Sequence, residues 1–574
     1  MEPVIRVAPA ECKNCYKCIR NCSVKAIACL NDKTNIIDDE CIYCGRCLLE
    51  CPHHARSIIS ELDIVKKAIR RGEKLYVSLA PSYIAAFPGA SILELSAALK
   101  QLGFTHVEET AIGADRVTRE YENLMRQGKM PNIITTSCVS VNLLIEKYYP
   151  SLVPSLAPVQ TPAVAHARML KQIYANRAKV VFIGPCAAKK FERQENRELF
   201  AVLTFSELAA WLKEEGIKPD RQDQEGKALK NTIVRFYPAP GGIIRNLGRE
   251  ERRLYECVDV DGPDRCIQIL DSIVHDKLTG FFLEMNICPG GCLGGPVLQQ
   301  MGVSFLGARD RLIKNALKLN EAPATMTEGI PVDLAKTFHD RSRHQAPFSE
   351  EAIREVLASV GKLTPDQELN CGCCGYRTCR EKAEAVLRGK ADIQMCVPHM
   401  REMAESMANT VVEHTPTSIL ILDDKLVVKQ INPSARELLH ITDQTVGSPA
   451  ADLWPDLDLP DLLREAPVIR RRLTSAGLGL ILEISVVSVQ YSRTVFLLIN
   501  DVTNEERLRE SRRKVTEETA QVARSVLNRQ MQTVQEIAGL LGETTADAKS
   551  ALSRLIRSIE SETADNGSMT GKSG

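Results

Sequence analysis

Cysteine is the residue whose number and spacing in this chain predict chemistry. Twenty cysteines occur among 574 residues, and most of them lie in tight groups of the C-x2-C type. Disulfide scaffolds are short secreted chains, whereas grouped thiols in a long chain favour metal ligation. We therefore expect metal centres in a compartment that keeps thiols reduced.

Two cysteine groups near the N-terminus share one spacing. Residues 12–22 read CKNCYKCIRNC and residues 41–51 read CIYCGRCLLEC, so C-x2-C-x2-C-x3-C occurs twice. Three thiolates of such a loop bind a cubane 4Fe-4S cluster, and the fourth cysteine ligates the cluster of the other repeat. Structural zinc normally uses two separated pairs instead. The region resembles a bacterial two-cluster ferredoxin. This implies the ligand sets Cys12, Cys15, Cys18 and Cys51, and Cys41, Cys44, Cys47 and Cys22.

Apolar runs in the central region predict the elements that position further cysteines. Short runs typical of strands alternate there with amphipathic stretches typical of helices. The runs are residues 75–80, 132–137, 180–184 and 280–287, and two of the amphipathic stretches are residues 91–102 and 116–127. The alternation predicts an α/β domain built on a parallel sheet.

Three of these runs end in cysteine. Cys138 and Cys288 follow their runs directly, Cys186 follows the run 180–184 after Pro185, and Cys292 lies just beyond the last run. A single buried cysteine is ordinarily a small apolar side chain. Four cysteines at strand ends indicate a ligand site, because open α/β sheets bind ligands at the carboxyl ends of their strands.

The sequence around these cysteines resembles the di-iron (iron-only) hydrogenases. The matching motifs are TTSC at 135–138, GPCAAKK at 184–190 and CPGGCLGGP at 288–296. The resemblance implies an active-site cluster in which a cubane shares a thiolate with a di-iron unit. That unit carries CO, cyanide and a bridging dithiolate. Cys138, Cys186 and Cys288 would hold the cubane, and Cys292 would bridge to the di-iron unit.

The same resemblance implies roles in cluster binding for a lysine and several glycines of these motifs. Lys189 would donate a charge-assisted hydrogen bond to a cyanide ligand. The glycines of the third motif would let the backbone approach the cluster and point N–H groups at its sulfur atoms. These glycines are Gly290, Gly291, Gly294 and Gly295.

Three departures from the hydrogenase motifs concern turnover rather than metal binding. Ser137 occupies the position where fast enzymes carry a proton-relaying cysteine. A thiol with a pKa of ~8.5 exchanges protons near neutrality, whereas a serine alkoxide is inaccessible. Gly184 replaces a methionine, and two glycines rather than three precede Pro296. The metal ligands therefore match the family while proton delivery is altered.

A further cysteine group follows the central region. Residues 371–379 read CGCCGYRTC, and Cys396 completes the pattern C-x2-C-x4-C-x16-C. The group resembles the small iron–sulfur module that follows hydrogenase-like domains in some bacterial sensors, which makes Cys373 the spare cysteine. Zinc is the alternative, since four thiolates also suit it. The expected ligands of this fourth cubane are Cys371, Cys374, Cys379 and Cys396.

The cysteine-free C-terminal third resembles a PAS sensor domain. Two β-branched strands flank Asp423, Asn432 opens a helix, and a closing strand ends at Asp501. Residues 507–559 then read as one helix with an apolar stripe. The stripe predicts packing on its own domain or, as we favour, a two-helix dimer contact. Its members are Val515, Val522, Val526, Met531, Val534, Ile537 and Leu541.

These features divide the chain into six segments of a multidomain α/β protein. We expect a ferredoxin-like two-cluster domain, an α/β hydrogenase-like cluster domain, a small 4Fe-4S module, an α+β PAS domain, a helical dimerisation and signalling segment, and a disordered tail. In that order they span residues 1–62, 63–345, 346–404, 405–505, 506–560 and 561–574.

Composition narrows the class of protein further. Basic and acidic residues balance at 73 each, which argues against nucleic-acid binding. No apolar run approaches the ~18 residues of a membrane span, and the N-terminus lacks the apolar core of a signal peptide. We expect a cytoplasmic protein.

The leading hypothesis is a sensory di-iron hydrogenase that binds and slowly oxidises hydrogen. Its partners would be H2 and protons, a redox donor or acceptor protein, a downstream signalling protein and a second copy of the chain. One alternative is a catalytic, ferredoxin-linked hydrogenase, and the other is a cubane-only cluster-assembly protein without a di-iron unit. Lys189 and Cys292 favour a di-iron unit, and the PAS resemblance favours sensing over bulk turnover.

Iron content tests the predicted cluster set. Sixteen ligand cysteines imply four cubanes and a di-iron unit, hence ~18 iron atoms per fully matured chain. Elemental analysis of the matured protein measures iron and zinc together. Iron near ~8 atoms per chain with stoichiometric zinc would contradict the prediction, because two cubanes alone would account for it.

Overall fold

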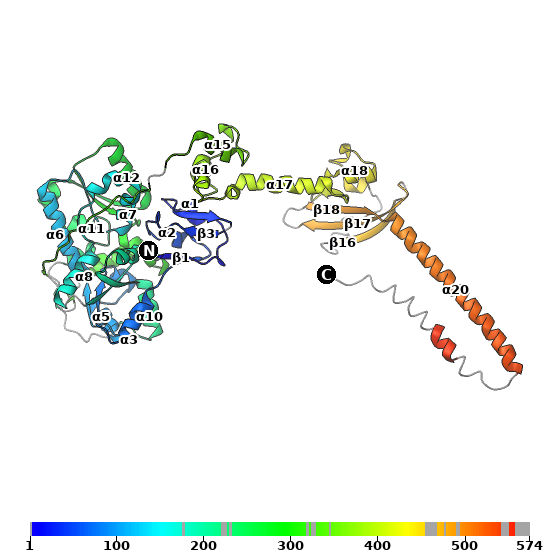
Figure 1. The fold of residues 1–574 in the computed structure, drawn as a ribbon, viewed down its shortest axis with the longest axis horizontal. Helices are drawn as coiled ribbons and strands as arrows, with labels where there is room; N and C mark the ends of the chain where they lie inside the picture. The colour runs from blue at the N-terminus through cyan, green and yellow to red at the C-terminus, as the bar shows by residue number, and fades with distance from the viewer. Residues whose placement is uncertain are drawn as a thin grey trace. The chain divides into compact units, whose positions relative to one another are not determined.

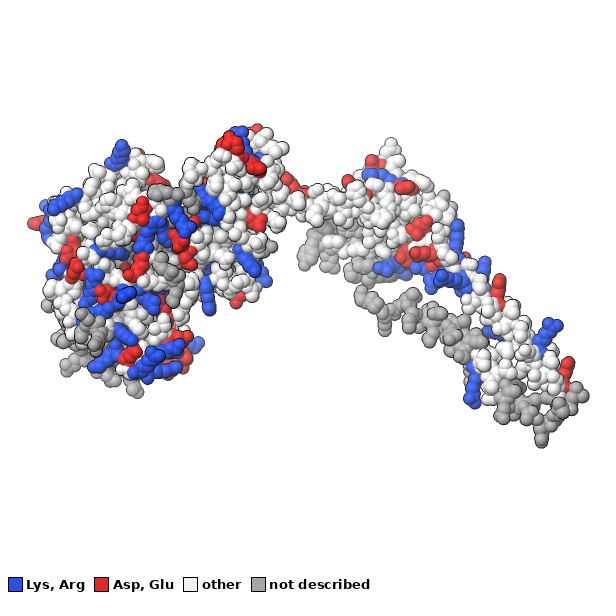
Figure 2. Space-filling model, viewed as in Figure 1, with Lys and Arg blue, Asp and Glu red and all other residues white. Residues whose placement is uncertain are grey.

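The chain is described by a computed structural model that divides it into two compact units, Met1–Arg401 and Glu402–Gly574 (Figure 1). Within the described residues, no helix combines the length and the apolar character needed to cross a membrane. Basic and acidic side chains are interspersed on the face shown in Figure 2. The described residues are 3–31, 33–174, 178–219, 227–228, 232–316, 321–322, 329–343, 346–453, 468–475, 478–489, 494–540 and 550–556.

Two similar loops carry the N-terminal cysteines. Left-handed residues lie at the same two positions of each loop, Asn14 and Tyr16 in the first and Tyr43 and Gly45 in the second. Such turns form concave nests of N–H groups, a feature of many iron–sulfur sites. Two short helices and two antiparallel ribbons complete the module. They are α1 (Lys17–Arg20) and α2 (Arg46–Glu50), β1 (Ile5–Val7) with β4 (Arg56–Ile58), and β2 (Ile27–Leu30) with β3 (Lys33–Ile36).

The central region contains two parallel sheets instead of the single sheet that we predicted. The first has the strand order β6-β5-β8-β9, and the second has the order β11-β12-β7. Every strand pairing within them is parallel. The strands are β5 (Leu75–Leu79), β6 (His106–Glu109), β7 (Ile133–Ile134), β8 (Lys179–Gly184), β9 (Leu199–Thr204), β11 (Glu256–Asp261) and β12 (Phe281–Asn286).

The predicted strands and helices of this region are present, with some shifted ends. The helix predicted over residues 91–102 begins at Ile92, where Ser91 and Glu94 form a capping box. The helix predicted from residue 116 begins earlier, at Ala111. The main helices of the first unit are α3 (Leu62–Arg70), α5 (Ile92–Gln101), α6 (Ala111–Gln127), α7 (Val139–Tyr148), α8 (Pro162–Ile173), α9 (Ala188–Glu195), α10 (Phe205–Glu214), α12 (Pro263–Asp276), α14 (Phe305–Ala316), α15 (Glu350–Ala358) and α16 (Cys379–Leu387).

The second cluster module, which contains α15 and α16, packs against the N-terminal module. Lys25 Nζ donates to the Gly375 carbonyl oxygen at 2.7 Å, and the Cys29 amide donates to the Lys390 carbonyl oxygen at 2.8 Å. Residues of both modules share one buried apolar cluster. Two regions far apart in the sequence therefore form one body within the first unit.

The second unit is built on one antiparallel sheet with the strand order β15-β14-β18-β17-β16. Asn432 begins α18 as predicted, and its Oδ1 accepts from the amides of Ile419 at 2.8 Å and Ala435 at 2.9 Å. One side chain thus joins the helix start to the sheet. The elements are α17 (Val397–His414), β14 (Ser418–Leu422), β15 (Val428–Ile431), α18 (Pro433–Leu439), β16 (Val468–Ser475), β17 (Leu480–Val489), β18 (Thr494–Asp501) and α20 (Thr503–Leu540).

The long helix α20 exposes most of its predicted apolar stripe. Five members of the stripe are 48% to 62% exposed, so packing of these residues on their own sheet, one of the two alternatives above, is wrong. They are Val515, Val522, Val526, Val534 and Ile537. Leu541, the end of the predicted helix and the tail at 561–574 lie outside the described residues.

A fully buried ion pair in the first unit predicts a large stability effect. Arg235 Nε donates to Glu109 Oε2 at 2.9 Å, and both side chains are 0% exposed. Glu109→Gln should lower the free energy of unfolding by about 3–5 kcal/mol, because the buried guanidinium then lacks its counter-charge. Chemical denaturation followed by circular dichroism measures the loss.

The control is Asp310→Asn, which breaks an exposed ion pair with Lys314 in the same unit. Exposed pairs contribute at most about 1 kcal/mol, so this variant should unfold close to wild type. Similar losses in the two variants would contradict the argument from burial.

Candidate active site

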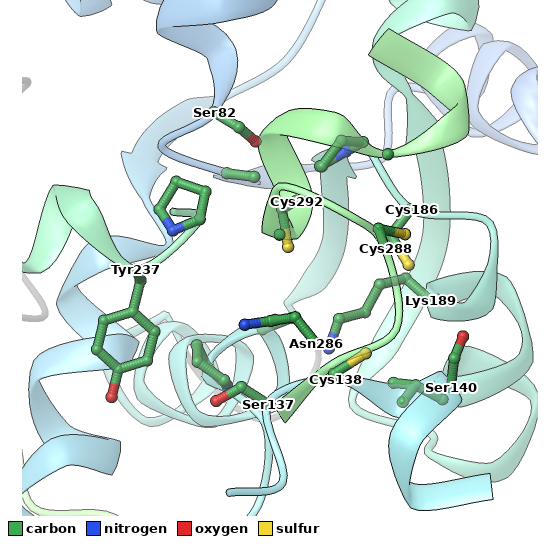
Figure 3. Close-up of a pocket in the computed structure, with 18 of the residues that line it drawn as sticks. Ser82, Ser137, Cys138, Ser140, Cys186, Lys189, Tyr237, Asn286, Cys288 and Cys292 are labelled. Carbon is green, nitrogen blue, oxygen red and sulfur yellow. The ribbon is translucent and has the colours of Figure 1, made fainter. Parts of the chain in front are cut away.

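The four cysteines predicted to hold the active-site cluster meet at one cavity. Cys138 and Cys288 follow strands of the three-stranded sheet, whereas Cys186 follows β8 of the four-stranded sheet. The cavity has a volume of about 120 Å³ and lies where the carboxyl ends of the two sheets meet. Figure 3 shows the sulfur atoms directed toward a common space, from Cys138, Cys186, Cys288 and Cys292.

Burial raises the pKa of the Cys186, Cys288 and Cys292 thiols. It raises the pKa of Cys186 to about 11 and the pKa of Cys292 to about 12, and neighbouring thiolates add to the effect. Lys189 opposes the shift in both pKa values. A coordinating metal deprotonates a thiol outright. The donor set therefore fits iron, whose positive charge would replace the thiol protons.

Lys189 brings positive charge to the same cavity (Figure 3). Its Nζ donates to Glu192 Oε2 at 2.7 Å, and the two side chains are 10% and 3% exposed. An ammonium has three N–H donors. The contact with Glu192 therefore leaves donors for an anionic ligand in the cavity, as the predicted contact with cyanide requires.

The glycines of the third motif satisfy the geometry of their own loop. Gly290 and Gly291 have φ values of 81° and 64°, in the left-handed region. A Cβ atom at Gly294 would collide with the carbonyl oxygen of Pro289. Side chains are therefore excluded at these positions before any cluster is considered.

The N–H groups of three of these glycines have acceptors within the protein. Each of the three amides donates to an oxygen atom of the protein. Gly290 donates to Asp261 Oδ2 at 2.5 Å, Gly291 to the Cys288 carbonyl at 2.9 Å and Gly295 to the Cys292 carbonyl at 3.4 Å. These glycines shape the loop that carries the two cysteines, and a direct role in cluster binding stays a prediction.

The two altered motif positions lie at or near the cavity. Ser137 lines it, and its Oγ lies 3.4 Å from Tyr121 Oη. A Cβ atom at Gly184 would come within 2.6 Å of the Phe182 ring, and Phe182 also lines the cavity. Phe182 therefore occupies the space that a methionine at position 184 would need.

Several of the N-terminal thiols lie close enough together to affect one another's pKa values. Burial raises the pKa of Cys41 well above its usual value, and charges on Cys44, Cys47 and Cys22 raise it further. Cys22 of the first repeat therefore lies near the cysteines of the second repeat, and its role as a cluster ligand stays a prediction. In the first predicted set, charges on Cys12 and Cys15 raise the pKa of Cys18. The fourth predicted member, Cys51, is the C-cap residue of α2.

The structure also distinguishes the adjacent cysteines of the second cluster module. Cys373 is exposed and lies in a separate cavity. In the described chain, no group of three or more His, Cys, Asp or Glu side chains is arranged to hold a single metal ion. Cubane ligands bind different iron atoms and need no such arrangement. One small cavity is lined by Cys371, Cys374, Cys379 and Cys396, as predicted for the cluster ligands.

Sequence analysis missed the buried cations that contact the predicted ligands. Arg56 Nη2 donates to Cys18 Sγ at 3.1 Å, and Lys362 Nζ donates to Cys379 Sγ at 2.6 Å. Arg56 and Lys362 are 5% and 9% exposed. Buried cations are costly unless an anion lies beside them. Their positions therefore fit anionic thiolate clusters at both sites.

Sequence analysis also missed a buried acid near the cavity. Glu284 is 0% exposed in β12, and its Oε2 accepts from the amides of Ile243 and Ile244, each at 2.9 Å. Burial raises the pKa of Glu284 to about 8, and the two amides oppose this shift only in part. The signal in the sequence is one charged residue within the apolar run FFLEMN.

Glu284 predicts a stability that depends on pH. Because its folded-state pKa is raised to about 8, its stabilising effect is complete below the unfolded pKa and is lost as the pH rises through 8. Glu284→Gln stays neutral throughout. The variant should be as stable as wild type near pH ~4 and should unfold at a higher denaturant concentration than wild type near pH ~9. The difference in the free energy of unfolding should be about 1.4 kcal/mol for each unit by which the pKa is raised. If the free energies of unfolding of variant and wild type differ by the same amount at both pH values, the raised pKa of Glu284 is contradicted.

Three family models match the cluster-bearing parts of the chain. The model of the iron-only hydrogenase large subunit, C-terminal domain, matches residues 73–296. The 4Fe-4S binding domain matches residues 34–57, and a model of an Fe-S cluster domain matches residues 367–398. Iron–sulfur binding is thereby supported at both ends of the first unit as well as in its central region.

Two curated relatives are hydrogenases. The NADP-reducing hydrogenase subunit HndD of Solidesulfovibrio fructosivorans is 26% identical over 329 residues, covering 46% of this chain and 56% of that protein. The periplasmic Fe hydrogenase large subunit of Nitratidesulfovibrio vulgaris is 28% identical over 262 residues, covering 35% of this chain and 61% of that protein. The chain thus spans only a little more than half the length of the relatives it matches.

The solved structures that resemble parts of the chain have low sequence identities and low TM-scores. A variant of the FeFe-hydrogenase HydA1 from Chlamydomonas reinhardtii has 16% identity and a TM-score of 0.38, covering 50% of this chain and all of that one. The PAS domain of nitrogen regulation protein NR(II) from Vibrio parahaemolyticus has 23% identity and a TM-score of 0.15, covering 17% of this chain and 97% of that one. The family assignment depends on the sequence matches alone. These matches support an iron–sulfur protein whose residues 73–296 are similar to the iron-only hydrogenase large subunit.

Proposed function

We propose that the chain is a hydrogen-sensing di-iron hydrogenase. The observation that carries the proposal is the meeting of four cysteines and Lys189 at one buried cavity. Lys189 would donate to a cyanide ligand there. When bound, the di-iron unit supplies the reversible splitting of H2 into protons and electrons. The cubane would be held by Cys138, Cys186 and Cys288, with Cys292 as the bridge to the di-iron unit.

Proton delivery at the cavity suits slow turnover. Ser137 presents a hydroxyl where fast enzymes present a thiol, and its neighbour Tyr121 is fully buried. Burial raises the pKa of Tyr121, so this pair holds its protons near neutral pH. A protein with such a pair binds hydrogen without being built for bulk production.

The electron route is proposed from two shared cavities. Cys44 lines the active-site cavity. Cys22 lines a second cavity, of about 400 Å³, together with Cys371 of the second cluster module. Because Cys44 and Cys22 belong to one predicted cubane, that cubane has a neighbour on each side. Electrons would pass from the active site through it to the second cluster module.

The signal is proposed to leave through α17. This helix begins directly after the ligand Cys396, whose carbonyl accepts from the Met400 amide at 2.8 Å. A helix N-terminus carries partial positive charge, so a change in cluster charge acts on it. Near the other end, the Val412 carbonyl accepts from Asn432 Nδ2 at 3.0 Å. Asn432 belongs to the antiparallel unit, which we assign as the PAS domain from its sequence resemblance and five-stranded sheet.

A second copy of the chain is the proposed partner of the exposed apolar stripes. Besides the stripe of α20, the helix α17 exposes four apolar side chains spaced three or four residues apart, as in two-helix coiled coils. They are Met400, Met403, Met407 and Val411, each 51% to 67% exposed. A redox donor or acceptor and a downstream signalling protein, in the cytoplasm, complete the proposal.

Infrared spectroscopy and a turnover assay test this function together. The matured wild-type protein should show CO and cyanide bands and oxidise hydrogen slowly with an artificial dye as acceptor. Ser137→Cys should raise the rate by at most ~10²-fold, because it restores a group that titrates near neutral pH while Gly184 still differs. Cys292→Ala is the control, and it should lose the CO and cyanide bands while retaining the N-terminal cubanes.

Each alternative has its own outcome. A wild-type rate at or above ~10³ per second would overturn the sensing role in favour of a catalytic hydrogenase. Cubane signals without CO or cyanide bands would favour the cubane-only alternative. CO and cyanide bands that persist unchanged in Cys292→Ala would contradict the assignment of the bridging ligand.

A further inference from the structure

A row of hydrogen-bonding side chains connects the cavity with the edge of the four-stranded sheet. Thr110 lines the cavity, and its Oγ1 lies 2.7 Å from Ser78 Oγ. Ser78 Oγ lies 2.9 Å from His166 Nδ1, and the other ring nitrogen of His166 lies 3.4 Å from Glu108 Oε2. The second carboxylate oxygen of Glu108 lies 2.8 Å from His106 Nε2. The row is continuous over five side chains.

The row is buried along its length and reaches solvent at one end. Ser78, Glu108 and His166 are 0% exposed, and Thr110 is 5% exposed. His106 lies on β6, the edge strand, and its side chain is 17% exposed. Burying a carboxyl group and an imidazole costs free energy that apolar side chains would avoid. A continuous row that ends at solvent therefore indicates a role beyond packing.

Every member of the row can accept a proton at one atom while releasing another. A hydroxyl does so on one oxygen, an imidazole on its two nitrogens and a carboxyl group on its two oxygens. The residues also come from four different elements. Ser78 lies in β5, His106 and Glu108 in β6, Thr110 at the start of α6 and His166 in α8.

Ser137 offers a different set of contacts from the same cavity. Its hydroxyl lies 3.4 Å from Tyr121 Oη, which lies 3.4 Å from Thr136 Oγ1. Thr136 Oγ1 donates to the Val159 carbonyl at 2.8 Å, and both Tyr121 and Thr136 are 0% exposed. Within the described contacts this branch ends in the core, whereas the row through His166 reaches solvent.

We propose that Thr110, Ser78, His166, Glu108 and His106 relay protons between the cavity and solvent. The proposal rests on the proposed function, because splitting H2 releases two protons that must leave the cavity. For each proton, Thr110 Oγ1 accepts it while passing its own proton to Ser78, and Ser78 passes one to His166 Nδ1. His166 Nε2 releases a proton to Glu108, His106 Nε2 accepts one from Glu108 and His106 releases one to water. Each side chain that accepts a proton at one atom releases one from another atom, so the number of bonds to hydrogen in the row does not change.

Isosteric variants of the matured full-length chain test the relay. Thr110→Val removes the hydroxyl at the cavity end and fills the same volume, so no water can replace it. Ser78→Ala interrupts the next link. Thr118→Val is the matched control, because Thr118 is a buried threonine of the same helix whose hydroxyl contacts Tyr237 Oη at 2.6 Å, outside the row.

Two readouts separate the relay from a structural role. The first is the rate at which the infrared CO and cyanide bands change after a pH jump, and the second is hydrogen oxidation with its solvent isotope effect. Thr110→Val and Ser78→Ala should slow both rates by about 10²-fold, while the infrared bands at equilibrium and the unfolding midpoint stay those of wild type. Thr118→Val should retain both rates.

The outcomes distinguish this inference from the function on which it rests. Wild-type protein without CO and cyanide bands would overturn the proposed function and the relay together. Bands with unchanged rates in Thr110→Val would overturn the relay alone, and Thr110→Val decides the matter if Ser78→Ala fails to fold. Slowing that is accompanied by altered equilibrium bands in both variants, or shared by Thr118→Val, would also overturn it.

Discussion

The structure depends on how charge is balanced around buried thiols. Gathering cysteines in a core raises their pKa values through burial and mutual repulsion, as at Cys186 and Cys292. Iron can hold such thiolates, and buried cations such as Arg56 and Lys362 donate directly to ligand sulfur. The N-terminal and second cluster modules pack together through a shared buried apolar cluster and through hydrogen bonds such as that from Lys25 Nζ to the Gly375 carbonyl.

The active-site cavity exists because two parallel sheets point their carboxyl ends at one place. Either sheet alone would position only part of the predicted ligand set, since Cys186 follows a strand of one sheet and Cys138 and Cys288 follow strands of the other. The third-motif glycines, through φ values and crowding that exclude side chains, let a tight loop carry two ligands into the gap. Two series of hydrogen-bonded side chains reach the cavity, one at Ser137 and the other at Thr110.

The regions proposed for redox chemistry and for signalling are joined by short connections in the chain. The predicted cubane that includes Cys22 and Cys44 neighbours both the active site and the second cluster module. The last predicted ligand of that module, Cys396, directly precedes α17, and α17 continues into the antiparallel unit. A helix that starts at a charged cluster couples electrostatics to backbone position. This arrangement supports the proposal of a sensor.

The sequence by itself determined the features that are local in the chain. Cysteine spacing is local, so the sequence indicated two N-terminal cluster loops and a second cluster module, and it predicted the strands before Cys138, Cys186 and Cys288 and the helix start at Asn432. Tertiary structure alone decided that two sheets, not one, form the site. It also decided that glycine amides bind backbone and carboxylate oxygens, and that Arg56, Glu284 and His166 face buried partners. Those contacts join residues many positions apart, so they depend on packing that no local pattern encodes.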